Sequence, residues 1–298
     1  MGDNDASGAP RRRLPTTDPV ARSLSEALLA GDVAGLRALL VEDPGLAGCL
    51  LEDARGNCIA PLHLFADAPG HRARPGEIVS ALAEAGADVD AAAVGSWHVE
   101  TALHWAASND DVALIDPLLD AGADIERAGS SIAGGPPMQS AVGYGQWAAV
   151  RWLAERGGTV DEDVAAVRGM VDELTTRVEA QPPHSPEALG RALWNAARAG
   201  QEETGALLVE NGAAVNWRAP WSGETPLDAA RAAGEDAMTA WLLERGALPG
   251  DVDRVTERAA SPAVTAAEAL TGEPAPRDRL RHGPGPGGSR RRRAVDQG

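Results

Sequence analysis

Two short phrases alternate along this 298-residue chain in a fixed order. The clearest copy of the first phrase is Thr-Ala-Leu-His at 101–104, and the clearest copy of the second is Ala-Gly-Ala-Asp at 121–124. Altered copies of the first phrase lie at 60–63, 136–139, 191–194 and 225–228. Altered copies of the second phrase lie at 85–88, 156–159, 211–214 and 245–248. Five copies make an internal repeat, and a chain of this kind folds by stacking copies of one small unit.

The glycine in the second phrase measures the length of the repeat. These glycines are Gly86, Gly122, Gly157, Gly212 and Gly246. Successive members lie 36, 35, 55 and 34 residues apart. Gly122 suits the left-handed backbone conformation that closes a helix, and the other four hold the equivalent place. The one long step indicates that about twenty residues are inserted into an otherwise regular array.

One repeat has the pattern of two helices joined by a tight turn. Thr101 stands where its hydroxyl caps the first helix, and the small side chains of Ala106 and Ala107 let a neighbouring helix approach closely. The residues at 109–111, Asn-Asp-Asp, are a turn signal. A second helix follows, with apolar residues at helical spacing from Val112 onward. Because two helices cannot bury their apolar faces alone, neighbouring units must stack on them.

These phrases, in this order and at this spacing, resemble the ankyrin repeat family. The family motif is Thr-Pro-Leu-His-x-Ala, followed by a glycine turn, a second helix and Gly-Ala-Asp. The resemblance implies an all-α solenoid of helix-turn-helix repeats with hairpin or loop fingers. It also implies that the five glycines are structural, that His63 and His104 brace the backbone between adjacent repeats, and that the concave face binds a protein.

The chain divides into three regions. Residues 1–17 and 252–298 are expected to be disordered tails, because they are rich in Arg, Pro and Gly and lack periodicity. Residues 18–251 form the repeat domain, which begins with a capping helix pair and carries a helical insertion at about 161–184. A stripe from Val164 to Val178 predicts one amphipathic helix of about 17 residues in the insertion. That helix either covers the neighbouring repeats or docks a partner.

Charge is distributed unevenly along the chain. The net charge is −17, and residues 18–251 alone carry −21 because both tails are slightly basic. An acidic body argues against nucleic-acid binding, which needs a cationic face. The acidic charge suits a basic protein partner, or serves solubility alone. The chain contains no lysine, and its abundance of Ala, Gly, Asp and Arg is typical of a GC-rich bacterium.

The sequence gives few signs of catalysis, metal binding or membrane insertion. The histidines and the two cysteines, Cys49 and Cys58, show no metal-ligand spacing, and buried free thiols in a cytoplasmic monomer are the expected state of the cysteines. The glycine-rich stretch at 129–135 lacks the Lys-Ser/Thr that follows a phosphate-binding loop, so a finger loop is expected there. No apolar run is long enough to span a membrane, and the N-terminus lacks the apolar core of a secretory signal. We therefore expect no enzyme activity, no cofactor, no metal and no membrane contact.

Aromatic residues are the strongest binding candidates. Large aromatic side chains on a small, acidic surface are typical of binding hot spots. By the resemblance, some of them lie on the fingers, one faces the concave side and two lie at the turn between the helices of one repeat. These candidates are Trp97, Trp105, Tyr144, Trp147, Trp217 and Trp221. The alternative for Trp97 and Trp217 is packing between adjacent fingers.

Two classes of function follow from these observations. The first is a non-catalytic module that binds one protein partner through its concave face and fingers. Within this class, the acidic body also permits an immunity or inhibitor protein that neutralises a basic toxin. The second class is an enzyme, or a subunit of one, with a site hidden in the insertion. The sequence favours the first class because it offers no nucleophile with a base and no metal-binding cluster.

Overall fold

The computed structural model describes residues 11–95, 99–180 and 184–250, and within them fourteen α-helices form seven consecutive pairs. The first four pairs are α1 (Pro19–Ala30) with α2 (Val33–Glu42), α3 (Pro61–Ala66) with α4 (Pro75–Glu84), α5 (Ala102–Ser108) with α6 (Val112–Asp120), and α7 (Pro137–Tyr144) with α8 (Trp147–Glu155). The remaining three are α9 (Glu162–Val167) with α10 (Val171–Ala180), α11 (Pro186–Arg198) with α12 (Glu202–Glu210), and α13 (Pro226–Ala233) with α14 (Asp236–Glu244).

The pair α5 and α6 shows how the repeat motif makes its fold. The backbone N–H of Thr101, the residue before α5, donates to His104 Nδ1 at 3.1 Å, so the first turn is closed by its own motif. Gly122 then ends α6 with φ +96°, and the N–H of Ala123 donates to Leu118 O at 3.0 Å. A residue with a side chain is strained at that φ, which explains why glycine recurs there.

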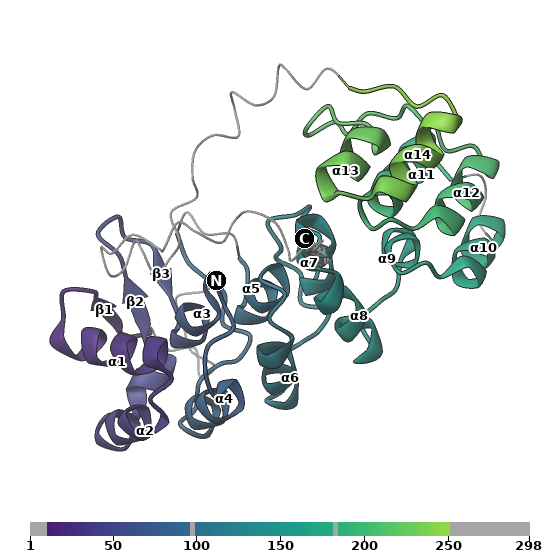
Figure 1. Ribbon diagram of the computed structural model, residues 1–298. Coiled ribbons are helices and arrows are strands. Elements are labelled where there is room, and N and C mark those ends of the chain that lie inside the picture. Colours follow the sequence, from purple (N-terminus) through teal and green to yellow (C-terminus); the bar gives the residue numbers. More distant parts are fainter. Residues whose placement is uncertain (1–10, 96–98, 181–183, 251–298) are drawn as a thin grey trace, which may run out of the picture.

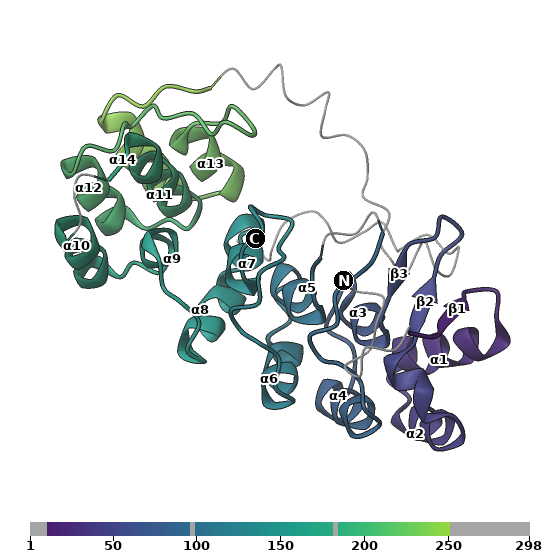
Figure 2. The ribbon, with the colours of Figure 1, turned by 180° about the vertical axis from the view of Figure 1, so that it is seen from behind.

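The pairs stack in two layers, which confirms the predicted helical solenoid. First helices lie beside first helices, as in α3, α5 and α7, and second helices form the other layer (Figures 1 and 2). One apolar core runs through the layers from α1 to α8 and includes Leu24, Phe65 and Leu103, which are fully buried. Small residues such as Ala106 lie between the layers and allow the close approach of helices.

The N-terminal region differs from the predicted tail over 1–17. Residues 1–10 lie outside the described residues, but Arg13–Pro15 form strand β1. This strand pairs in parallel with β2 (Leu50–Glu52), which follows a short 3-10 helix at Pro44–Gly48 and pairs antiparallel with β3 (Cys58–Ile59). Leu14 is buried in the sheet's contact with the helices. One apolar residue between Arg13 and Pro15 carries too little periodicity to predict a three-residue strand.

The insertion forms two helices, and the prediction of one helix over Val164 to Val178 is wrong. The helix stops at Val167, and Gly169, with φ +67°, reverses the chain before α10 begins. The apolar stripe is shared between two cores, since Val164 and Val167 pack with α1–α8 whereas Leu174 packs with α11 and α12. The insertion therefore has the helix-turn-helix form of a repeat, without the phrases that mark the others.

Helix α9 joins two apolar cores. Its residues Val164 and Val167 belong to the core of α1–α8, whereas Ala165 and Ala166 belong to a second core with α11 and α12. The row of helix pairs changes direction at the segment between α8 and α9 (Figure 1). The layer of first helices therefore bends between α7 and α11. A side chain from α11 contacts α7, as described below.

Candidate functional site

The first phrase of each repeat supplies a side chain that reaches the next repeat. His63 Nε2 donates to Glu100 O at 2.9 Å, and His104 Nε2 donates to Gly135 O at 3.2 Å. His104 Nδ1 accepts from the Thr101 backbone, which fixes the neutral tautomer. Burial lowers the pKa of His63 to about 4 and also lowers the pKa of His104, so both rings are neutral at pH 7. These two histidines are inter-repeat braces.

In the last repeat an aspartate takes the place of the histidine. Asp228 Oδ2 accepts from the backbone N–H of Thr225 at 2.9 Å and from that of Gly250 at 2.7 Å. These hydrogen bonds lower the pKa of Asp228 against the opposing effect of burial. The altered phrase Thr-Pro-Leu-Asp therefore makes the same kind of brace with a charged acceptor.

In the fourth repeat a tryptophan takes the same place, and it starts an aromatic cluster. Trp194 is 7% exposed, and its ring meets that of Trp221 edge-on with centroids 5.5 Å apart. Trp221 also meets Trp217 at 5.8 Å, and both of these residues come from the loop that follows α12. We call residues 217–224 the tryptophan finger and Trp194, Trp217 and Trp221 the tryptophan cluster. Edge-to-face packing of this kind adds to the stabilisation from buried area.

The tryptophan cluster rests on a helix that has no side chain at the point of contact. A Cβ built on Gly190 of α11 would lie 2.2 Å from Trp217 Cγ, so only glycine allows the ring to lie there. Trp217 Nε1 donates to Glu187 Oε2 at 3.2 Å, one helical turn before Gly190. The tryptophan finger is thus held on α11 by both packing and a hydrogen bond.

Arg198 connects this cluster to the preceding half of the molecule. Its guanidinium carbon lies 4.7 Å from the Trp194 ring centroid and 5.6 Å from that of Trp147 in α8. Its Nη1 also donates to the carbonyls of Val142 and Gly143 in α7, each at 3.3 Å. Burial lowers the pKa of Arg198, and the charge of Glu224 opposes that shift. The bonds to the end of α7 suit a cation, because a helix C-terminus carries partial negative charge.

The structure brings together four of the six aromatic candidates. Trp147, Trp217 and Trp221 are joined through Arg198 and Trp194, and Tyr144 lies between Gly143 and Gly145, whose backbones both approach Arg198. Within this group Trp221 is 55% exposed and Tyr144 is 53% exposed, whereas Trp217 is 9% exposed. Trp221 and Tyr144 thus offer the open aromatic area, and Trp217 packs beneath. We call this surface the aromatic face.

Two other candidates lie elsewhere. Trp105 is only 7% exposed, because it packs edge-on against His63 and donates from Nε1 to Glu100 Oε2 at 3.1 Å. Its expected place on an open concave surface is therefore corrected: the residue that follows the histidine of the motif is covered here by the neighbouring repeat. Trp97 lies outside the described residues.

Sequence reasoning missed Trp194, Arg198 and Gly190. The signal for Trp194 was present, because it stands at the histidine position of the altered phrase at 191–194. Arg198 lies one turn further along the same helix, on the face that carries Trp194. Neither its stacking between two tryptophans nor its bond to α7 could be predicted, because both depend on the bend at α9.

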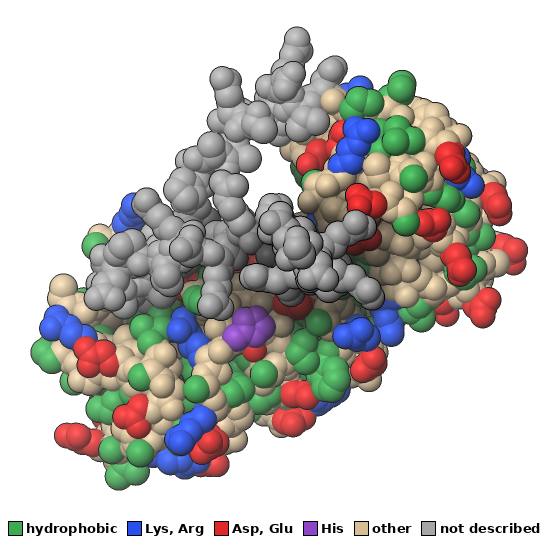
Figure 3. All heavy atoms as spheres, viewed as in Figure 1, with side chains coloured by type: hydrophobic (Ala, Val, Ile, Leu, Met, Phe, Trp, Pro, Cys, Tyr) green, Lys and Arg blue, Asp and Glu red, His purple; other side chains and the backbone are tan. Residues whose placement is uncertain are grey.

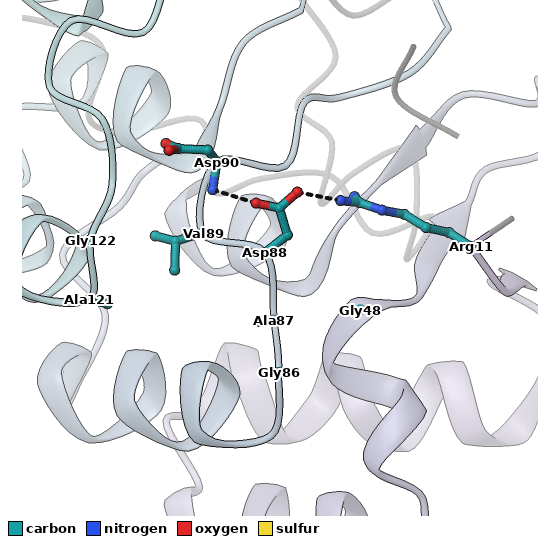
Figure 4. A pocket seen from close by; sticks show the side chains of 9 residues that line it. All are labelled: Arg11, Gly48, Gly86, Ala87, Asp88, Val89, Asp90, Ala121 and Gly122. Atoms are coloured by element: carbon teal, nitrogen blue, oxygen red, sulfur yellow. Dashed lines mark hydrogen bonds and ion pairs between the residues drawn. The ribbon is translucent and has the colours of Figure 1, made fainter. Parts of the chain in front are cut away.

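A separate cavity of about 300 Å³ lies in the N-terminal half. Figure 4 shows its polar side, where the buried Arg11 pairs with Asp88 at 2.7 Å. The rest of the lining is mostly the backbone of glycine turns, including Gly86 and Gly122. Burial raises the pKa of Asp90, whose carboxylate accepts from the backbone of the next turn. The lining contains no nucleophile, and its polar groups tie successive turns together.

No group of three or more His, Cys, Asp or Glu side chains within the described residues is arranged to hold a metal ion. None of the helices in this part of the chain combines the length and the apolar character that a membrane span requires.

Residues 100–129 match the family model of the ankyrin repeat. The chain is also similar to the crystal structure of the human ASB11 ankyrin repeat domain, with 24% identity, coverage of 76% of this chain and 99% of that one, and a TM-score of 0.45. No curated protein matches. Stacked helix pairs with a repeated phrase define a helical repeat protein. The matched segment, residues 100–129, is an ankyrin repeat within this array. Ankyrin repeats are in general protein–protein interaction modules and are typically not enzymes.

Proposed function

We propose that this protein is a non-catalytic module that recognises one protein partner through the aromatic face. The observation that carries the proposal is the exposure of Trp221, at 55%, on the buried rings of Trp194 and Trp217. Tyr144, 53% exposed, follows Gly143, whose carbonyl binds Arg198. Seven large apolar side chains of the described residues are exposed, and Trp221 and Tyr144 are the aromatic ones among them. A partner that closes over such rings removes apolar area from water, which is the usual origin of a binding hot spot.

The aromatic face is also prepared for binding before any partner arrives. Trp221 packs against Trp194 and Trp217, and Trp217 is fixed by Glu187 and by contact with Gly190. A side chain that is already ordered loses little conformational entropy when a partner covers it. Rigid tryptophans therefore make better anchors than the long charged side chains on the rest of the surface.

Charge favours a basic partner. Residues 161–250, which include the tryptophan finger, hold fifteen acidic residues and seven arginines. Figure 3 shows acidic side chains over the outer side of the half that contains α10, α12 and α14. This excess speeds the association of a cationic protein and makes the rate depend on salt. A cytoplasmic monomer is part of the proposal, and the buried free thiols of Cys49 and Cys58 suit a reducing compartment.

The test captures partners with the wild type and then compares the affinities of variants for them. Proteins captured from the native host by the wild type are identified, and the affinity of each is then measured with purified components. Trp221→Ala is expected to weaken binding at least about tenfold, or about 1.4 kcal/mol, with little change in stability. Val41→Ala, which alters an exposed apolar residue on α2, is the matched control and should bind as the wild type does. Equal affinity of the Trp221→Ala variant for every captured protein would overturn the proposal.

A further inference from the structure

The described chain ends beside the tryptophan finger. The backbone N–H of Gly250 donates to Asp228 Oδ2 at 2.7 Å, and Thr225 Oγ1 donates to Leu248 O at 3.1 Å. A Cβ on Gly250 would lie 2.6 Å from Gly223 O, which belongs to the finger itself. The polypeptide that follows Gly250 therefore starts two residues away, along the finger, from the half-exposed Trp221.

That following segment contains the densest positive charge in the chain. Four consecutive arginines stand at 290–293, whereas the half of the repeat domain from which the segment departs carries a net charge of −8. Opposite charges on one chain attract each other at a high local concentration. The arginine run begins forty positions after Gly250. A random coil of that length has an end-to-end distance of about 35 Å, which gives an effective concentration on the order of millimolar.

The tryptophans of this protein already bind arginine. Arg245 lies 3.9 Å from the ring centroid of Trp241, and Arg198 stacks on Trp194 and Trp147. Trp221 is the half-exposed member of the cluster, and no arginine of the described residues stacks on it. Its exposed half therefore offers a cation the same interaction that the other rings have.

Two carboxylates belong to the elements that carry the tryptophan cluster. Glu224 lies in the tryptophan finger and accepts from Ser222 Oγ at 3.0 Å, and Glu187 holds Trp217 from α11. One exposed cation, Arg218, lies in the finger and opposes an incoming arginine. A run of arginines can reach the two carboxylates and the ring at the same time, whereas a single arginine can reach only one of them.

We propose that the arginine run at 290–293 of this same chain docks on the tryptophan finger, with one guanidinium stacked on Trp221 and its neighbours paired with Glu224 and Glu187. The inference rests on the proposed function, since both assign the face of Trp221 to a cationic ligand. The docked arginines occupy the face that a basic partner needs. Partner binding is therefore autoinhibited, and replacing the four arginines strengthens it.

The test needs no partner. A spin label is attached to the full chain through Asp296→Cys, and it reacts selectively because Cys49 and Cys58 are both buried. Broadening of the tryptophan indole N–H resonances by the label is then measured, with assignments from Trp→Phe variants. We expect the Trp221 resonance to lose more than about half of its intensity while that of Trp152 in α8 is unchanged. The same labelled chain with Arg290→Ser, Arg291→Ser, Arg292→Ser and Arg293→Ser should show no loss at Trp221.

Three results overturn the inference. The first is a Trp221 resonance that the label does not affect, and the second is equal broadening after the four serine changes. The third is broadening of Trp221 when spin-labelled chain without ¹⁵N is mixed with ¹⁵N chain that carries no label. That result would place the arginines of a second copy on the finger. These outcomes are independent of the capture experiment. If Trp221→Ala leaves partner binding intact while the label still broadens Trp221, the proposed function fails and the docked arginine run stands as an intramolecular contact.

Discussion

Gly190→Ala tests whether the tryptophan finger is positioned by its contact with α11. A methyl group at this place would lie 2.2 Å from Trp217 Cγ and 2.3 Å from Cδ1, so the ring must move by more than about 1 Å to restore ordinary contact. Alanine favours a helix over glycine by about 0.8–1.0 kcal/mol. Overpacking costs about 1–3 kcal/mol, and the hydrogen bond from Trp217 to Glu187 contributes about 0.5–1.5 kcal/mol. We therefore expect a net loss of about 1–3 kcal/mol.

The matched control is Gly205→Ala in α12 of the same half. There the nearest atom to a new methyl group is Met238 Cε, the mobile end of a flexible side chain, at 3.3 Å. The helix propensity then dominates, and the change should leave stability the same or raise it by up to about 1 kcal/mol. Urea unfolding followed by circular dichroism measures both variants. If Gly190→Ala is as stable as Gly205→Ala and the Trp217 indole resonance is unmoved, the account of how the finger is held is wrong.

Three further predictions concern the braces and the buried tryptophan. His104→Ala should cost about 1–3 kcal/mol in urea unfolding, because it removes the hydrogen bond to Gly135 O and leaves the buried Thr101 N–H without its acceptor, and it should not abolish partner binding where the variant is folded. Trp105→Ala should cost about 3–5 kcal/mol, because the ring is buried, and a loss below 1 kcal/mol would contradict its burial. Burial lowers the pKa of His63 to about 4, so the stabilisation of the neutral ring is complete above its unfolded pKa and is lost as the pH falls from about 6.5 towards 4. The difference in unfolding free energy between the wild type and His63→Gln should shrink over that range. Asp163, whose pKa burial raises to about 6, acts in the opposite direction in both chains and therefore cancels in the difference.

The sequence predicts the parts of the fold that local interactions determine. The phrase at 101–104 closes its own helix turn through His104, and Gly122 ends the next helix through its own φ. The start of the first helix and the end of the second can therefore be predicted without the rest of the chain. The insertion was misread because an apolar stripe has the same spacing whether or not the chain turns at Gly169. The strand at 13–15 exists only because β2, far along the chain, pairs with it.

The aromatic face shows the same limit at the candidate site. Sequence alone marks Trp217 and Trp221 as finger residues and Tyr144 as a turn residue, but it does not show which rings lie open. Exposure depends on the path of neighbouring elements: Gly190 leaves room for Trp217, and the bend at α9 sets Arg198 against α7. The same limit explains the wrong prediction that Trp105 is exposed. The motif does not show that Glu100 and the neighbouring repeat cover its ring.

Site-specific photo-crosslinking reports which surface touches the partner, and it therefore tests whether the aromatic face is the binding surface. A photoreactive amino acid is placed in turn at Trp221, Tyr144, Val41 and Thr176, the last of which is an exposed residue of α10 in the insertion. We expect one partner to be crosslinked from positions 221 and 144, and we expect positions 41 and 176 to give no product. Crosslinking of the partner from position 176, with none from 221 or 144, would place the docking surface on the insertion and contradict the account.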